Sequence, residues 1–181
     1  MPEGGWRLAR AAGSLLALAG LLVTCAPAVT VRGQPAARQP TRPPNFGFVF
    51  SFGVGAKNVL NTHDSTFTKD MVVGPSVTCH LTLTAAELDT VYWKMREIDF
   101  FRYPLNWVPP ERPGGSHVSP HSSWVLTVRT GRRTHEVREA GDSRTDDPAA
   151  ARLHSLFLLI ERMVMRKSEY KALPRPRGAY L

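Results

Sequence analysis

SVTCHLTLTAAELDTVYWKMREIDFF, residues 76–101, changes its apolar period from two to about 3.6 partway along its length. The first half alternates apolar with polar residues, as a strand with one buried face does; the apolar positions are Val77, Cys79, Leu81 and Leu83. The second half opens with Thr84 and, three residues later, Glu87, which is the spacing of a capping box. An apolar stripe at helical spacing follows: Leu88, Val91, Tyr92, Met95 and Ile98. We therefore predict a strand that leads into a helix ending near Asp99, with Phe100 and Phe101 packed against a sheet.

Other segments carry strand patterns of the same kind. Phenylalanine recurs with period two at Phe46, Phe48, Phe50 and Phe52. Residues 58–62 and 66–71 flank a turn and indicate a hairpin, and residues 123–130 and 133–139 indicate another. Asp147 followed by Pro148 marks the start of a final helix, which we expect to run to about Lys171. The order of strands, helix, hairpin and helix predicts an α+β two-layer sandwich, with two helices on one face of an antiparallel sheet.

The N-terminus has the pattern of an export signal. Arg7 and Arg10 precede an apolar run over residues 11–23, which is too short to span about 30 Å of hydrocarbon as a helix. The motif Leu22-Val23-Thr24-Cys25 is similar to a bacterial lipobox, in which the cysteine is acylated. The alternative is ordinary cleavage after Ala28, which would release a secreted protein. We favour a signal peptide over residues 1–25 and lipidation of Cys25, with palmitate-type chains holding the protein on the membrane.

Three further segments follow from composition. Residues 26–44 hold five prolines and three arginines but no aromatic residue, and we expect them to form a disordered tether. Residues 45–173 should form a single α+β domain, and residues 174–181 a C-terminal tail. The protein would then lie in the cell envelope and face the periplasm or the exterior.

The net charge of +8 suggests nucleic acid at first, but its distribution does not favour that class of partner. Five of the 23 basic residues precede Asn45, and from Asn45 onward 18 Lys and Arg face 14 Asp and Glu. The nearest basic cluster, residues 129–138, is interrupted by Glu136. We expect no nucleic-acid partner.

Candidate catalytic groups are few. Cys79 and His80 are adjacent on a strand, so their side chains should point to opposite faces. Asp70 with His63, or with a histidine of residues 102–122, could carry out acid–base chemistry. His117 and His121 lie among prolines and glycines that exclude a metal-binding helix. We expect no metal and no cofactor, and the sequence leans away from an enzyme.

Residues 102–122 form a loop of unusual length, and long loops in small domains often carry function. Tyr103 and Trp107 could supply contact area for a partner, together with His117 and His121. They could equally fold back and cover the edge of the sheet. Asp70 completes the set of candidate binding residues.

Residues 52–181 resemble a group of uncharacterised bacterial envelope lipoproteins. The motifs that carry the resemblance are Phe52-Gly53-Val54-Gly55-Ala56, Thr66-Phe67-Thr68-Lys69-Asp70-Met71, Leu83-Thr84 with Glu87-Leu88, Ile98-Asp99-Phe100-Phe101 with Tyr103-Pro104, and Leu173-Pro174 with Pro176-Arg177-Gly178. The resemblance implies an exported, lipid-anchored domain and transfers no catalytic residue. We expect a binding or scaffolding module for an envelope protein or a cell-wall component; the alternative is an envelope hydrolase that uses Asp70 and a histidine.

Overall fold

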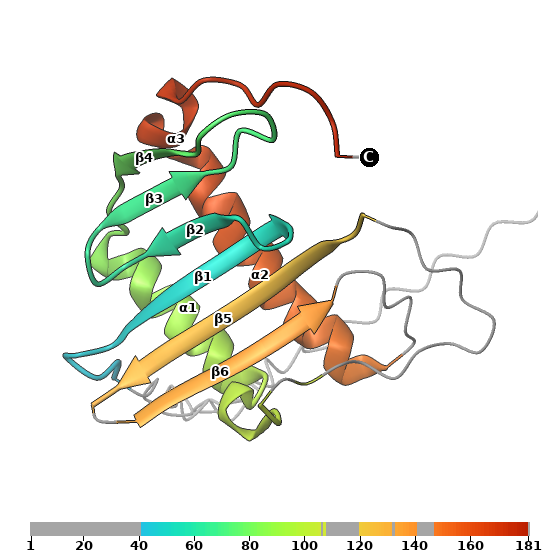
Figure 1. Cartoon of the computed structure of the whole chain (residues 1–181). Helices are drawn as coiled ribbons and strands as arrows, with labels where there is room; N and C mark the ends of the chain where they lie inside the picture. The colour runs from blue at the N-terminus through green and yellow to red at the C-terminus, as the bar shows by residue number, and fades with distance from the viewer. Residues whose placement is uncertain (1–40, 106, 108–119, 132, 141–146, 181) are drawn as a thin grey trace, which may run out of the picture. The chain divides into compact units, whose positions relative to one another are not determined.

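Six antiparallel strands form one sheet, and two long helices pack side by side on one of its faces (Figure 1). The computed structural model describes residues 41–105, 107, 120–131, 133–140 and 147–180. In sheet order the strands are β4 (Val77–His80), β3 (Thr66–Lys69), β2 (Asn58–Asn61), β1 (Gly47–Val54), β5 (Ser122–Thr130) and β6 (Arg133–Ala140). The helices are α1 (Ala85–Glu97), the short 3-10 helix η1 (Phe100–Arg102), α2 (Pro148–Arg166) and α3 (Ser168–Ala172). This architecture confirms the predicted α+β sandwich.

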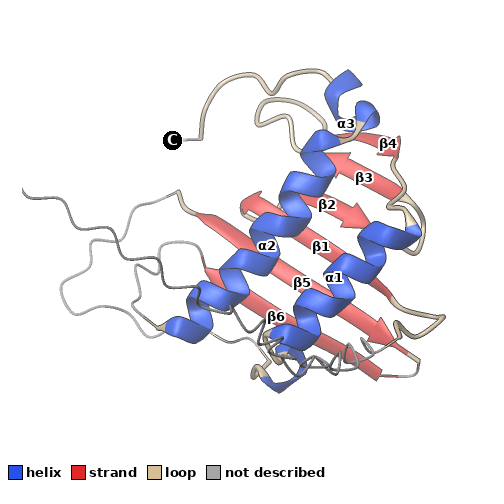
Figure 2. Ribbon diagram, turned by 180° about the vertical axis from the view of Figure 1, so that it is seen from behind, coloured by secondary structure: helices blue, strands red, loops and turns tan. Residues whose placement is uncertain are grey.

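The phenylalanines of β1 form the centre of the core. Phe48 and Phe50 are fully buried, and Phe50 contacts Phe157 of α2 at 5.6 Å between ring centroids. The strand register places Leu60 and Leu126 on either side of Phe50, so one layer of apolar side chains crosses the middle of the sheet. Both long helices cover this face (Figure 2). Each buried side chain of this size contributes about 1.5–3 kcal/mol relative to an exposed one.

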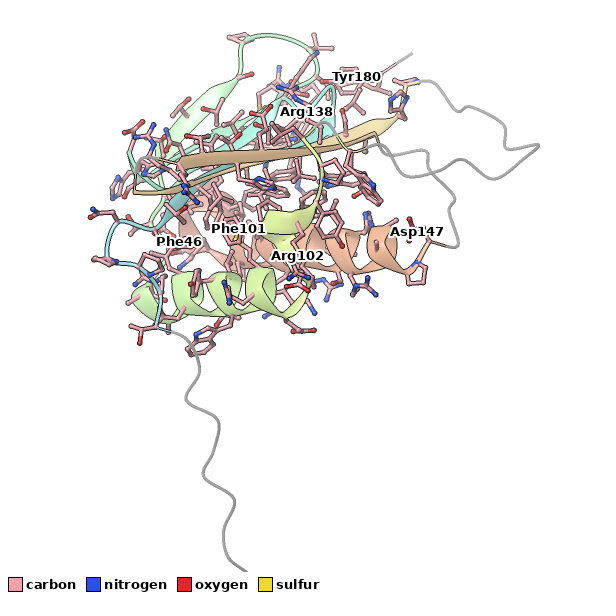
Figure 3. The ribbon with its side chains drawn as sticks, turned by 90° about the horizontal axis from the view of Figure 1, so that it is seen from below. Phe46, Phe101, Arg102, Arg138, Asp147 and Tyr180 are labelled. Atoms are coloured by element: carbon pink, nitrogen blue, oxygen red, sulfur yellow. The ribbon has the colours of Figure 1, made fainter. Side chains whose placement is uncertain are left out.

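The opposite face of the sheet carries small, β-branched and charged side chains. Thr68 and Thr78 share a hydrogen bond of 2.9 Å, and Thr127 donates to Glu136 at 2.8 Å. Arg138 lies on this side, away from the helices (Figure 3). None of the helices that the structure describes covers this face, which explains why its outward positions are polar.

The start of α1 confirms the predicted capping box. The hydroxyl of Thr84 accepts a hydrogen bond from the Glu87 amide at 3.2 Å, and the Glu87 carboxylate accepts one from the Thr84 amide at 2.7 Å. The same carboxylate contacts Lys167 Nζ at 2.6 Å, which joins the start of α1 to the end of α2. Burial opposes ionisation of Glu87, but the hydrogen bonds from Lys167 and Thr84 hold its pKa below the usual range.

The prediction of one final helix to Lys171 is wrong at its C-terminal end. Lys167 has extended backbone (φ −64°, ψ 141°), and it separates α2 from α3. The break directs Lys167 toward Glu87 and lets α3 place the Tyr170 ring 5.5 Å from that of Phe67. Tertiary contacts of this kind override local helix propensity.

Packed structure also begins earlier than the predicted boundary at Asn45. The Arg42 guanidinium contacts Asp89 of α1 at 2.6 Å, and the Pro43 carbonyl accepts a hydrogen bond from the Phe46 amide at 3.0 Å. The last residues assigned to the tether therefore dock on α1. The predicted signal segment and Cys25 lie outside the described residues. None of the helices that the structure describes has the length and apolar character needed to span a membrane.

Replacement of Thr84 by alanine tests the capping box. Thr84→Ala should lower the free energy of unfolding by about 1 kcal/mol, because an amide of the first turn loses its acceptor. Thr90→Ala is the matched control, since the Thr90 hydroxyl bonds the Ala86 carbonyl inside the helix and alanine favours helix. Urea unfolding of both variants measures the effect. Equal losses in the two variants would contradict the role of the cap.

Candidate functional site

Three hollows lined by described residues lie around the C-terminal end of α1. Two of them have volumes of about 500 Å³ each, and a smaller one of about 180 Å³ contacts Arg96, Asp99 and Arg102. We call the first large hollow the Trp107 cavity. Its lining residues are Glu97, Ile98, Asp99, Arg102, Tyr103, Pro104, Trp107, Asp147, Ala149 and Arg152.

The geometry of Asp99 creates this corner. Asp99 adopts a left-handed backbone conformation (φ 55°), which ends α1 and reverses the chain. The Asp99 carbonyl then accepts a hydrogen bond from the Arg102 amide at 2.8 Å, which closes η1. Phe100, fully buried in η1, fixes the turn against the core, so Arg102 projects from its end (Figure 3).

Tyr103 forms a wall of the Trp107 cavity. It is 9% exposed, and its hydroxyl donates a hydrogen bond of 2.7 Å to the Ala149 carbonyl in the first turn of α2. Its ring meets that of Trp107 edge-on at 5.4 Å. Burial raises the pKa of Tyr103, while the nearby Arg152 opposes the shift. Tyr103 therefore joins η1 to α2, and Trp107 packs on it with part of its ring accessible.

Charges of both signs surround the mouth of the cavity. Arg102 and Asp99 are exposed and 3.9 Å apart, too far for a tight ion pair. Asp147 caps α2 by accepting a hydrogen bond from the Ala149 amide at 2.8 Å. Figure 3 shows Arg102 and Asp147 on the two elements that flank this region. The arrangement offers donors and acceptors next to an aromatic wall, which suits a polar ligand with an apolar part.

The structure brings together two of the predicted binding residues and separates the others. Tyr103 and Trp107 are in contact. Tyr103 is buried, so it folds back onto the domain and is not part of an exposed binding surface. His121 directly precedes β5, and β1 and β2 separate β5 from β3, which ends next to Asp70. His117 lies outside the described residues.

Asp70 holds the C-terminal tail. Its carboxylate accepts hydrogen bonds from the Val72 amide, at 3.1 Å, and from the Tyr180 hydroxyl. Val72 also forms a parallel bridge with Arg177, and the Arg177 amide donates to the Met71 carbonyl at 3.2 Å. These contacts account for both carboxylate oxygens, so Asp70 has a structural role here.

His63 lies at the opposite end of the hairpin from Asp70. The β2–β3 register pairs Asn61 with Thr66 near the turn, whereas Asp70 follows Lys69 at the far end. Asn61 accepts hydrogen bonds from the His63 and Asp64 amides, which is the Asx-type turn that the sequence also allowed. The structure therefore does not bring His63 and Asp70 together.

Cys79 occupies the position expected for a core cysteine. It pairs with Phe67 on the helix-facing side of the sheet, and His80 points to the other side. Burial raises the pKa of the Cys79 thiol, and the nearby Glu169 adds to this shift. Both effects disfavour the nucleophilic thiolate.

Buried Glu139 and partly exposed His154 form a pair that the sequence did not predict. Glu139 is 6% exposed; its Oε1 lies 3.6 Å from His154 Nδ1, and its buried Oε2 has no hydrogen-bond partner in the described part of the chain. The Trp124 ring meets the His154 ring edge-on at 4.9 Å. The hydrogen bond to Glu139 raises the pKa of His154, against burial. Burial raises the pKa of Glu161, which lies two turns further along α2.

A signal for this pair was present in the sequence. In β6, residues 135, 137 and 139 share one side of the strand, and Val137 faces Leu126 in the core. The same phase places Glu139 inward, although its charge suggested solvent. No group of three His, Cys, Asp or Glu side chains in the described segments is placed to hold a metal ion.

Comparison with known proteins adds no assignment. No family model matches this sequence, and no curated protein is significantly similar to it. The resemblance to bacterial envelope lipoproteins therefore stays a prediction, and the site must be interpreted from its own geometry.

The pair of Glu139 and His154 predicts a pH dependence of stability. Because Glu139 raises the pKa of His154 in the folded state, the pair contributes its full stabilisation of the fold below about pH 6.5, the pKa of histidine in the unfolded chain. That contribution disappears as the pH rises through the folded pKa. Glu139→Gln should remove it, an effect of about 0.5 kcal/mol or less, since solvent screens a histidine that is 36% exposed.

Unfolding of wild type and variant between pH 5.5 and 8.5 measures this difference. Glu136→Gln is the control, because Glu136 lies on the same strand but faces the other side of the sheet. Parallel pH curves for wild type and Glu139→Gln would contradict the assigned pairing.

Proposed function

We propose that this protein is an exported cell-envelope lipoprotein whose α+β domain binds an envelope partner through the Trp107 cavity. The cavity itself is the observation that carries the binding role. Its volume of about 500 Å³ falls within the range of ligand sites, and it combines an aromatic wall with charged groups of both signs. The lipobox-like Cys25 and the proline-rich segment after it support the anchoring.

The charges at the cavity favour a polar partner over an apolar one. Arg102 and Arg152 can bind carboxylate or phosphate groups, and Glu97 and Asp99 can accept hydrogen bonds from amines or amides. A segment of an envelope protein or a peptide-containing wall component offers both kinds of group. Trp107 supplies the rigid apolar contact that most often dominates binding energy.

The alternative of an envelope hydrolase built on Asp70 has weaker support. Asp70 already accepts hydrogen bonds from Val72 and Tyr180, and its nearest predicted histidine partner lies at the far end of a hairpin. A general base must lie within hydrogen-bond reach of the proton that it abstracts. Binding therefore remains the function that the geometry favours.

Intact-mass measurement of the mature protein tests the anchor. The full chain, made in a bacterial host, should begin at Cys25 and carry the added mass of acyl chains, and it should sediment with membranes. Cys25→Ala should lack this mass and leave the membrane fraction, because no thiol is present to be acylated. A wild-type chain that begins at Val29 with no added mass would contradict lipidation.

Truncation of Trp107 tests the binding role. Trp107→Ala should lower the yield of an envelope partner captured by cross-linking by about tenfold or more, as expected for a central aromatic contact. Trp93→Ala, on the exposed side of α1, is the matched control and should retain the partner.

Because Trp107 also packs on the core, a second variant keeps this test informative. Arg102→Glu reverses an exposed charge at the cavity without removing buried surface. Thermal melting of each variant verifies the fold. Wild-type retention by both Trp107→Ala and Arg102→Glu would refute binding through this cavity.

A further inference from the structure

We propose that the second large hollow, here called the Arg96 cavity, binds the phosphate group of an organic phosphate. It has a volume of about 520 Å³ and is lined by Phe101 of η1, whereas Arg102 of η1 lines the Trp107 cavity. The residues that matter for the argument are Pro43, Tyr92, Arg96, Phe101, Arg133 and His135. This inference goes beyond the proposed partner binding and does not depend on it.

Three parts of the chain meet at this cavity. Tyr92 and Arg96 belong to the C-terminal half of α1, Phe101 belongs to η1, and Arg133 and His135 begin β6. In β6, Arg133 and His135 share the side of the strand that carries Val137, which faces the helices. Figure 3 shows Phe46 and Phe101 between the sheet and α1, at this end of the molecule. The cavity is thus an opening of the sandwich at the turn between β5 and β6.

The charged side chains of the lining are all basic. Arg96 and Arg133 line the cavity, and none of its lining residues is Asp or Glu. Three acids of the neighbouring elements contact other bases: Asp89 contacts Arg42 at 2.6 Å, Glu97 contacts Lys94 at 2.7 Å, and Glu136, on the far face of the sheet, contacts Arg138 at 2.8 Å. Asp99 lies nearer: it lines the smaller hollow together with Arg96 and is 3.9 Å from Arg102.

His135 adds a ring nitrogen that lacks a partner. Its Nε2 is buried and has no hydrogen-bond partner in the part of the chain that the structure describes. The ring is held edge-on against Phe100, with centroids 5.2 Å apart, and contacts Phe101 at 5.8 Å. Buried polar atoms are nearly always hydrogen-bonded in native proteins, and in the tautomer that is protonated at Nε2 this nitrogen can donate to an anion.

The donor set suits phosphate better than carboxylate. Two guanidinium groups, one imidazole and the hydroxyl of Thr130 supply more donors than the two oxygens of a carboxylate accept together. A phosphate group has three or four oxygens, and arginine binds it through paired hydrogen bonds. The cavity is also larger than a phosphate ion, and Pro43, Tyr92 and Phe101 offer apolar walls to an organic substituent.

Calorimetric titration of the full chain with defined anions tests the site. The Cys25→Ala background serves for all arms, so the outcome does not depend on lipid anchoring. Phenyl phosphate should bind saturably and more tightly than inorganic phosphate, which lacks the apolar part, and more tightly than benzoate, which lacks the third oxygen. Arg96→Gln and Arg133→Gln should each weaken phenyl phosphate binding by about tenfold or more, because each removes a charge-assisted hydrogen bond.

Arg129→Gln is the matched control. It removes the same charge from the same hairpin, but Arg129 faces the other side of the sheet. All three arginines are exposed, so their replacement should leave the melting temperature unchanged. Equal weakening by Arg129→Gln, the absence of saturable phosphate binding, or benzoate binding as tight as that of phenyl phosphate would each overturn the proposal.

Sedimentation with vesicles identifies the source of the phosphate. Binding to phosphatidylglycerol vesicles but not to phosphatidylcholine vesicles, lost in Arg133→Gln and kept in Arg129→Gln, would assign the site to a lipid headgroup. Saturable phenyl phosphate binding without vesicle binding would assign it to a soluble phosphate ester. If no phosphate binds at the Arg96 cavity while the partner still binds at the Trp107 cavity, the phosphate proposal fails and the proposed function stands.

Discussion

The burial of only one face of the sheet is the constraint on which this structure depends. Phenylalanine at alternate positions of β1 gives the central strand one aromatic side, and the register extends that side across Leu60 and Leu126. Leaving this surface exposed to water would be unfavourable, since burial of each of these side chains contributes about 1.5–3 kcal/mol. The helices α1 and α2 lie along that face and cover it (Figure 2). The other face stays polar because nothing in the described chain covers it.

A helix layer of finite length leaves openings where the helices end. Here α1 ends at Glu97, and Asp99 turns the chain into η1 before the edge of the sheet at β6 is fully covered. Phe100 is buried at this corner, and residues next to it line the two large cavities. Arg96, near the end of α1, therefore lines the Arg96 cavity, and Arg102, in η1, lines the Trp107 cavity. Basic residues are also favoured there because the C-terminal end of a helix carries partial negative charge.

Much of the fold could be predicted from the sequence, because its determinants are local. The alternation in β1 and β5, the capping box at Thr84 and the Asp147-Pro148 helix start each depend on residues a few positions apart. The break at Lys167 could not be predicted, because the contact that Lys167 makes there is with Glu87, 80 residues away in the chain. Tyr103 is similar: its hydroxyl partner lies 46 residues further along, so burial could not be distinguished from exposure.

The candidate site was harder to predict than the fold for the same physical reason. The sequence pointed to Tyr103 and Trp107, which the structure brings into contact, but it gave no indication that Arg96 and Arg133 line one cavity. They belong to different layers of the sandwich, and only the packing of α1 under β6 brings them together. Glu139 was not among the predicted site residues, although the phase of its strand pointed inward.

Folding determines where the positive charge of the chain lies relative to the cavities. From Asn45 onward the chain has a modest basic excess, and the sequence alone could only describe it as dispersed. Folding pairs several acids with specific bases: Glu87 with Lys167, Glu97 with Lys94 and Glu136 with Arg138. Arg96 and Arg133 are left beside a partly apolar hollow, where an anion would meet less competing water. Dispersed positive charge attracts any polyanion weakly, whereas positive charge at a shaped cavity selects a ligand by size and geometry. The proposed site would therefore favour one defined anion over a charged polymer.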